Sequence, residues 1–164
     1  MKKKSDLNKI LISVIVPIFN EEDIIELFYQ SALKLIQSNK NINYEFLMID
    51  NGSQDQTIHF LKKFSKKKEF KLIELSNYFG KESAILCGLD ESRGDYVVII
   101  DPDLEDPLEL IPEMYKEMKK GFDIIYAKRS NKGYSFNFTN ILKKYFYKIF
   151  EYFSDKNLKI YPDT

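Results

Sequence analysis

Short apolar runs alternate with amphipathic segments along this chain of 164 residues. The apolar runs cover residues 11–18, 44–49, 71–75, 96–100 and 123–126. Because most of them lack polar alternation, they predict β-strands that are buried on both faces. The segments between them have helical periodicity and cover residues 22–37, 56–64, 81–92 and 107–119. Parallel strands need crossover connections, so this order predicts an α/β fold: a three-layer sandwich with a mostly parallel sheet.

Polar segments follow the first four runs, where the predicted strands end. They read PIFNEE at residues 17–22, DNGSQD at residues 50–55, SNYFGK at residues 76–81 and DPDLED at residues 101–106. Ligands of open α/β sheets bind beyond the carboxyl ends of the strands. We therefore expect these four segments to form one site.

The acidic segment after the fourth run carries the strongest chemical signal. Asp101 directly follows buried apolar positions, and its charge would cost several kcal/mol there without a partner. It needs a cation or a strong set of hydrogen bonds. Asp101 and Asp103, one residue apart on an extended backbone, suit Mg²⁺ or Mn²⁺, which bind one or two carboxylates together with substrate phosphates. A solvent-exposed turn would explain Glu105 and Asp106, but not Asp101.

The other loops each have two interpretations. Asp50, Asn51 and Ser53 form an ordinary turn before a helix, or they face a nucleobase or ribose beside helix-start amides. Residues 20–22 are an acidic first helical turn, or they belong to the same site.

Composition limits the functional classes. The 25 Lys and Arg residues balance the 25 Asp and Glu residues, which gives no argument for nucleic acid and leaves any phosphate to local charge. The single cysteine, Cys87, excludes an intrachain disulfide and fits a reducing, cytoplasmic compartment. No stretch approaches the ~18 consecutive apolar residues of a membrane span.

Five ordered segments resemble those of family 2 glycosyltransferases. They are ISVIVPIFNEE at residues 12–22, IDNGSQD at 49–55, FGKESA at 79–84, RGDYVVIIDPDLEDP at 93–107 and KR at 128–129. The resemblance is to the polyprenyl-phosphate branch, which includes dolichol-phosphate mannose synthase. It implies a glycosyltransferase A-type fold, a UDP- or GDP-sugar donor, Mg²⁺ or Mn²⁺, and a polyprenyl-phosphate acceptor at the inner face of the membrane. A homo-oligomer is compatible with it.

Matched position by position, the resemblance implies specific site residues. Those that bind the nucleotide are Pro17, Phe19, Glu21, Asp50, Asn51, Ser53 and Lys81. Those that bind the metal are Asp101, Asp103 and Glu105, and those with a catalytic role are Asp101, Asp103 and Arg129. Arg129 would face the diphosphate or the acceptor phosphate. The implied reaction is a metal-assisted displacement with inversion at the anomeric carbon.

The chain also departs from the family pattern. Asn51 replaces the second aspartate of a D-D-G-S turn, and Pro102 replaces a small residue between the two aspartates. Asn77 and Tyr78 stand where this branch commonly has Arg-Asn, which leaves Lys81 as the remaining nearby cation. Residues 161–164 resemble the start of a further catalytic and acceptor-binding region, so we expect the chain to be truncated relative to the family.

Three regions are expected on these grounds: a basic tail at residues 1–10, a catalytic domain at residues 11–135, and an amphipathic segment at residues 136–164. In the last region, aromatic residues recur at helical spacing, with Lys143, Lys144 and Lys148 between them. Such a stripe packs into a core or rests on an anionic membrane surface, and the family resemblance favours the membrane.

Two alternatives to a glycosyltransferase remain at this point. A nucleotidyltransferase also uses strand-end carboxylates and a metal, but residues 19–22 replace the glycine-rich loop expected after its first strand. A catalytically silent module that binds a nucleotide or a lipid is the other.

Overall fold

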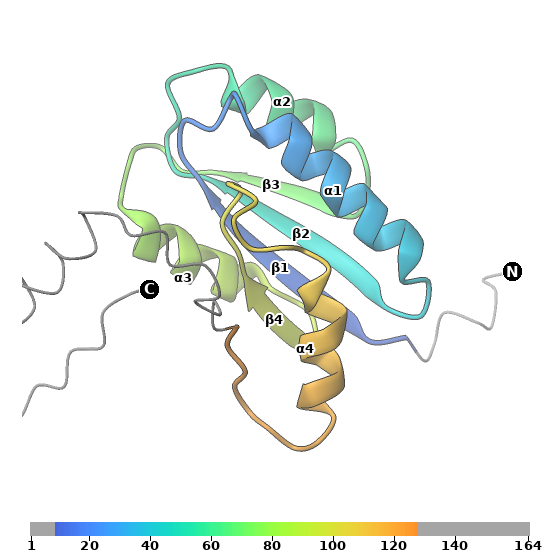
Figure 1. The fold of residues 1–164 in the computed structure, drawn as a ribbon. Helices are drawn as coiled ribbons and strands as arrows, with labels where there is room; N and C mark the ends of the chain where they lie inside the picture. The colour runs from blue at the N-terminus through green and yellow to red at the C-terminus, as the bar shows by residue number, and fades with distance from the viewer. Residues whose placement is uncertain (1–8, 128–164) are drawn as a thin grey trace, which may run out of the picture. The chain divides into compact units, whose positions relative to one another are not determined.

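The computed structural model describes residues 9–127, which form four strands and four helices in alternating order. These are β1 (Leu11–Ile18), α1 (Ile25–Ser38), β2 (Asn43–Asp50), α2 (Thr57–Phe64), β3 (Phe70–Glu74), α3 (Lys81–Glu91), β4 (Tyr96–Ile99) and α4 (Leu110–Met118). Figure 1 shows their arrangement. Arg129 and the predicted amphipathic segment lie outside the described residues, as does most of the predicted basic tail.

The strands form one parallel sheet in the order β3-β2-β1-β4. β1 is central, and seven of its eight residues are buried. Each parallel neighbour is reached through a helical crossover, as the sequence pattern requires. The predicted mostly parallel α/β sandwich is confirmed.

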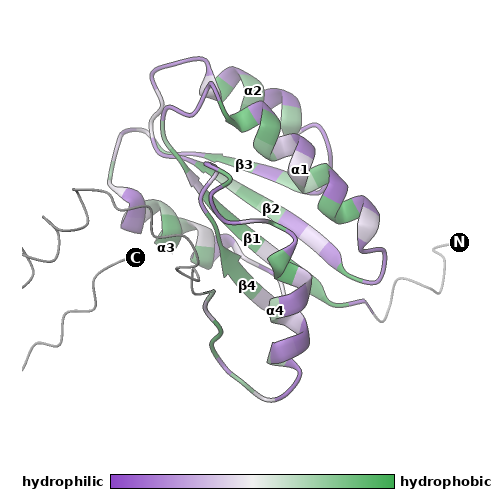
Figure 2. Cartoon of the chain, in the orientation of Figure 1, coloured by the Kyte–Doolittle hydropathy of each residue, from purple (hydrophilic) through white to green (hydrophobic). Residues whose placement is uncertain are grey.

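The two faces of the sheet have separate apolar clusters. Val14 and Val16 of β1 belong to the larger cluster, where α1, α2 and α4 pack, whereas Ile15 faces α3. In Figure 2, apolar and polar residues alternate along α1 and α2 while β1 is mainly apolar. Successive side chains of a strand point to opposite faces of the sheet, and amphipathic helices cover both faces. The three layers result from this arrangement.

Helix α3 approaches the sheet closely because residue 88 is a glycine. A Cβ atom placed there would lie 2.4 Å from Cγ2 of Ile15. Gly88 therefore determines the height of α3 above β1, and with it the position of the loop that precedes the helix.

The structure corrects three expectations. Residues 123–126 are not a strand: they pair with no other described residue, and Ile124 and Tyr126 are 84% and 81% exposed. An apolar run becomes a strand only when a neighbouring strand pairs with it. β4 is half-exposed rather than buried on both faces, because α3 contacts β1 and β2 and leaves Val97 and Ile99 uncovered. The third correction concerns the acidic segment, which is a turn and not extended backbone.

Among residues 9–127, no helix combines the length and the apolarity that crossing a membrane demands.

Candidate functional site

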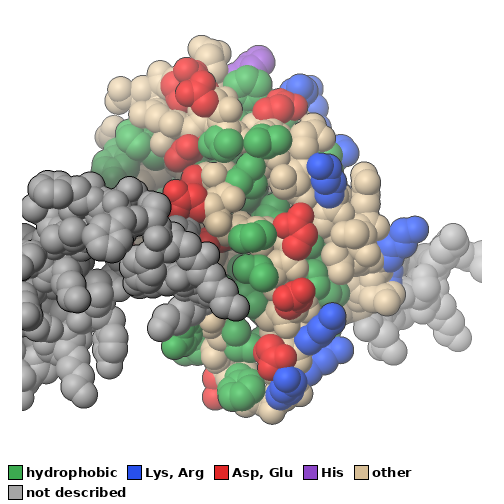
Figure 3. Space-filling model, viewed as in Figure 1, with side chains coloured by type: hydrophobic (Ala, Val, Ile, Leu, Met, Phe, Trp, Pro, Cys, Tyr) green, Lys and Arg blue, Asp and Glu red, His purple; other side chains and the backbone are tan. Residues whose placement is uncertain are grey.

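The loops after the four strands leave the same edge of the sheet, because all four strands are parallel (Figure 1). In Figure 3, acidic side chains lie where the loops after β1 and β2 emerge and also across the middle of the visible face, and most visible Lys and Arg side chains line one side. This edge therefore carries local negative charge, although the net charge of the whole chain is zero.

The loops after β1 and β2 are joined by hydrogen bonds. The backbone N–H of Asn20 donates to Oγ of Ser53 at 3.0 Å, and Oδ1 of Asn20 accepts from the N–H of Gln54 at 2.8 Å. The N–H of Glu21 donates to Oγ1 of Thr57 at 2.8 Å. Asn20 has φ 54°, a left-handed conformation that asparagine tolerates better than most residues. These contacts hold Glu21 and Ser53 in fixed positions at the sheet edge.

The loop after β3 is fixed to the β2 loop in the same way. Asn51 is 3% exposed, and its Oδ1 accepts from the N–H of Phe79 at 2.9 Å. Gly52 has φ 81°, and a Cβ atom there would lie 2.6 Å from the carbonyl carbon of Asn77. Only glycine fits this close crossing of two backbones. Asn51 thus has a structural partner, and its amide oxygen makes a contact that a carboxylate oxygen at this position could also make.

Asp50 lies beneath these loops with one oxygen unsatisfied. The residue is 3% exposed, and its Oδ2 accepts a long hydrogen bond, 3.4 Å, from the N–H of Ser53. Its Oδ1 is buried and has no hydrogen-bond partner among residues 9–127. A buried acceptor of this kind costs free energy unless a ligand supplies a donor.

Two aromatic rings lie at the same edge. The rings of Phe19 and Tyr78 are 4.5 Å apart between centroids and tilted by 49°. They are 37% and 59% exposed. Pro17, in contrast, is buried within β1, where it pairs with Ile49. Tyr78 was not among the predicted site residues; the signal in the sequence was that Asn77 and Tyr78 replace the Arg-Asn of the family pattern.

The acidic segment begins where β4 ends. Ile100 is buried and donates its N–H to the carbonyl of Ile15 at 3.1 Å, so Asp101 emerges directly from the sheet. Lys81, the first residue of α3, places its Nζ 2.7 Å from Oδ2 of Asp101. The side chain of Asp101 is 37% exposed, so the expected burial of its charge is wrong, but the carboxylate does have this ammonium group as a cationic partner.

The rest of the acidic segment is a tight turn. Oδ1 of Asp103 accepts from the N–H of Glu105 at 2.9 Å, and both residues are exposed. Leu104 between them has φ 60°, a costly conformation for a branched side chain. Strain of this kind persists where the surroundings fix the loop, and here Leu104 packs against the apolar core.

Electrostatic effects connect the first and fourth loops. Burial raises the pKa of the Glu21 carboxyl, and the negative charges of Asp103 and Asp101 raise it further. No group of three or more metal-ligating side chains occurs within residues 9–127. The donor set fits Mg²⁺ or Mn²⁺ held by two carboxylates, since such ions complete their coordination with substrate phosphates and water.

A family model described as Glycosyl transferase family 2 matches residues 13–163, and the chain belongs to this family. YkcC of Bacillus subtilis, an uncharacterized glycosyltransferase, is 37% identical over 150 residues, covering 90% of this chain and 46% of the relative. The bactoprenol glucosyl transferase of Shigella phage SfV is 34% identical over 139 residues, covering 84% of this chain and 45% of the relative. The chain spans about half the length of the curated relatives it matches.

Solved structures agree with the fold. Glucosyl-3-phosphoglycerate synthase of Mycobacterium tuberculosis, in complex with Mn²⁺ and UDP-glucose, matches with a TM-score of 0.53 and 27% identity over 68% of this chain and 40% of its own. TarS of S. aureus (residues 1–349) in complex with UDP matches with a TM-score of 0.51 and 27% identity over 63% of this chain and 32% of its own. The described residues therefore have the α/β fold of glycosyltransferases of the A type.

Proposed function

We propose that the four-loop edge binds a UDP- or GDP-sugar together with Mg²⁺ or Mn²⁺, and that the protein transfers the sugar to a polyprenyl phosphate. The observation that carries this proposal is the location of the acidic turn. Asp101 and Asp103 lie within electrostatic reach of Glu21 on the β1 loop, at the same edge as Asp50.

The Asp50 end suits a nucleobase. Its unsatisfied Oδ1 would accept a hydrogen bond from a ring N–H, which uracil and guanine both offer. Phe19 and Tyr78 supply exposed aromatic surface beside it, on which a base can stack. These features support a nucleotide whose base carries a ring N–H, as the bases of UDP and GDP both do.

The acidic end suits the diphosphate and its metal. Asp101 and Asp103 would hold the ion, Glu105 is the third acid of the turn, and Lys81 is a cation within reach. When bound, the ion would supply positive charge for the departing nucleoside diphosphate. Arg129, which lies outside the described residues, is proposed from the sequence alone to face the diphosphate or acceptor phosphate.

A lipid phosphate makes a strong general base unnecessary. With a second pKa of about 6, such a phosphate already carries an anionic oxygen at neutral pH. That oxygen would form a bond to the anomeric carbon while the bond from this carbon to the donor phosphate breaks, with inversion. Two relatives named bactoprenol glucosyl transferases support a polyprenyl acceptor. The position at the inner face of the membrane is proposed from the family resemblance alone.

Substitution of the acidic pair tests the binding step. Asp103→Asn keeps the shape of the side chain and removes one negative charge, so Mn²⁺-dependent affinity for UDP or GDP should fall by about tenfold or more, or ~1.4 kcal/mol. Asp90→Asn removes the same charge from an exposed position on α3 and is the matched control. Isothermal titration calorimetry would measure both, and equal affinities for wild type and Asp103→Asn would refute the assignment.

Sugar transfer needs a separate assay. Incubation with UDP- or GDP-sugar, Mn²⁺ and polyprenyl phosphate should yield a glycolipid that depends on Asp103. Metal-dependent nucleotide binding without any glycolipid would instead favour the silent module.

A further inference from the structure

Lys81 makes the contact to Asp101 that a metal ion would also need. Its Nζ is 2.7 Å from Oδ2 of Asp101, and the side chains are 53% and 37% exposed. The contact joins the first turn of α3 to the end of β4, across 20 positions of sequence. Because the ammonium and the carboxylate belong to different elements, the packing of α3 on the sheet brings them within reach of each other.

An exposed ion pair usually contributes little to stability, so its environment decides whether it has another role. Burial raises the pKa of Glu21, and the negative charges of Asp103 and Asp101 raise it further, so the three carboxylates lie within electrostatic reach of one another. Glu21, Asp101 and Asp103 form an acidic cluster. Among the described ion pairs, the one that involves a member of this cluster is that of Lys81 with Asp101. Without it, the cluster would carry a larger uncompensated negative charge.

A divalent cation and an ammonium group repel each other at contact distance, so they compete for the same carboxylate. The lysine side chain has a flexible four-carbon stem, and its charge can move to another anion once it is released. The diphosphate of the donor would be the anion that arrives with the metal. Binding of the metal and binding of the nucleotide would then support each other.

We propose that Lys81 is an exchangeable counter-ion: it neutralises Asp101 before the donor binds, a divalent cation displaces it, and its ammonium group then contacts the diphosphate. This inference rests on the proposed donor site and adds a coupling between its two ligands. The lysine would keep metal affinity low without nucleotide and raise it when nucleotide is present.

The test compares Mn²⁺ binding with and without UDP or GDP, measured by the electron paramagnetic resonance signal of free Mn²⁺. Lys81→Met removes the ammonium group with little change in side-chain length, so Mn²⁺ alone should bind several-fold more tightly than to wild type. Added nucleotide should increase that affinity less in Lys81→Met than in wild type. Lys81→Arg keeps the charge and should behave like wild type in the absence of nucleotide.

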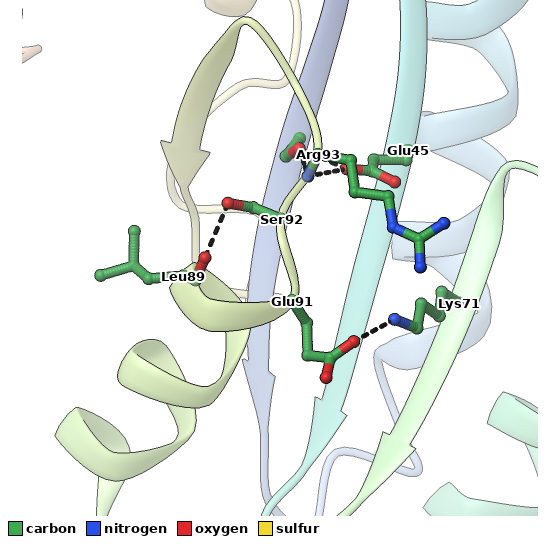
Figure 4. Close-up of polar contacts among 7 residues, drawn as sticks. Glu45, Lys71, Leu89, Glu91, Ser92 and Arg93 are labelled. Atoms are coloured by element: carbon green, nitrogen blue, oxygen red, sulfur yellow. Dashed lines mark hydrogen bonds and ion pairs between the residues drawn. The ribbon is translucent and has the colours of Figure 1, made fainter.

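Lys71→Met is the matched control. Lys71 on β3 forms an ion pair with Glu91, the last residue of α3, as Figure 4 shows. Since α3 rises about 1.5 Å per residue, this pair is roughly 15 Å from Lys81 along the helix. Lys71→Met removes the same charge and a similarly exposed ion pair, and should leave Mn²⁺ affinity unchanged.

The outcomes separate the two proposals. If UDP or GDP and Mn²⁺ bind wild type together but Lys81→Met binds Mn²⁺ alone no more tightly, the counter-ion exchange is wrong and the donor site stands. If Lys71→Met increases the affinity for Mn²⁺ by the same factor, the effect comes from net charge, and the counter-ion exchange is also wrong. If wild type binds neither nucleotide with Mn²⁺, both proposals fail.

Discussion

Tyr44 on β2 is 5% exposed, and its hydroxyl group has no hydrogen-bond partner among the described residues. A buried hydroxyl without a partner retains its desolvation cost, so Tyr44→Phe should raise the free energy of unfolding by about 1 kcal/mol. Urea unfolding of both proteins at neutral pH would measure this difference. A less stable variant would indicate that the hydroxyl has a partner in solution.

The same residue predicts a dependence on pH. Burial raises the pKa of Tyr44 to about 12, above the value of about 10 for an unfolded tyrosine. Its contribution to stability is therefore complete below pH ~10 and is lost as the pH rises towards ~12. The stability advantage of Tyr44→Phe should widen over this window, which urea unfolding at about pH 9 and about pH 11 would show. A constant difference would contradict the assigned cause.

Sequence reasoning identified the kinds of residue at the site better than their contacts. It predicted that Asp101 needs a cation or strong hydrogen bonds and kept Lys81 as the nearby cation, but it did not pair the two. Their contact depends on how closely α3 packs on the sheet, which no local pattern encodes. Thr57 was missed for the same reason, since its hydroxyl accepts from Glu21, 36 residues away.

At the level of elements, the apolar runs predicted all four strands within one residue of their observed ends, including β3 and β4, which are only partly buried. Helix α1 begins at Ile25 instead of residue 22, because residues 20–22 are held in the loop by hydrogen bonds to the β2 loop. The run at residues 123–126 has the composition of a strand, and only the absence of a described partner distinguishes it.

Gly88 gives a test of how α3 is positioned. Gly88→Ala gains about 1 kcal/mol of helix propensity, but overpacking against Ile15 costs typically 1–3 kcal/mol. We expect a net loss of about 1 kcal/mol in the free energy of unfolding, measured by chemical denaturation. The double variant with Ile15→Ala should lose less than the sum of the single changes, because the clash is then absent. Strict additivity would mean that the two residues do not limit the approach of α3.

At the scale of the whole molecule, the chain has no net charge but an uneven distribution of it. The acidic cluster lies at the carboxyl edge of the sheet, which suits a metal bound with a diphosphate. Residues 136–164 lie outside the described residues, and their role at a membrane surface stays a prediction from aromatic and lysine spacing.

Liposome flotation tests that prediction. The full chain should float with vesicles that contain anionic lipid, and a version that ends at Asn131 should float less, because it lacks the apolar and basic side chains. Added salt should weaken the binding of the full chain by screening the lysine charges. Identical flotation of the two chains would count against a membrane role for this segment.

The central claim is that Asp101 and Asp103 hold a divalent ion that also binds the donor diphosphate. A crystal structure with Mn²⁺ and UDP or GDP, with the manganese located by its anomalous scattering, tests it most directly. The account predicts one manganese peak between the two carboxylates and the phosphates, with Nζ of Lys81 moved from Asp101 to the diphosphate. A nucleotide bound without manganese at these carboxylates would contradict it.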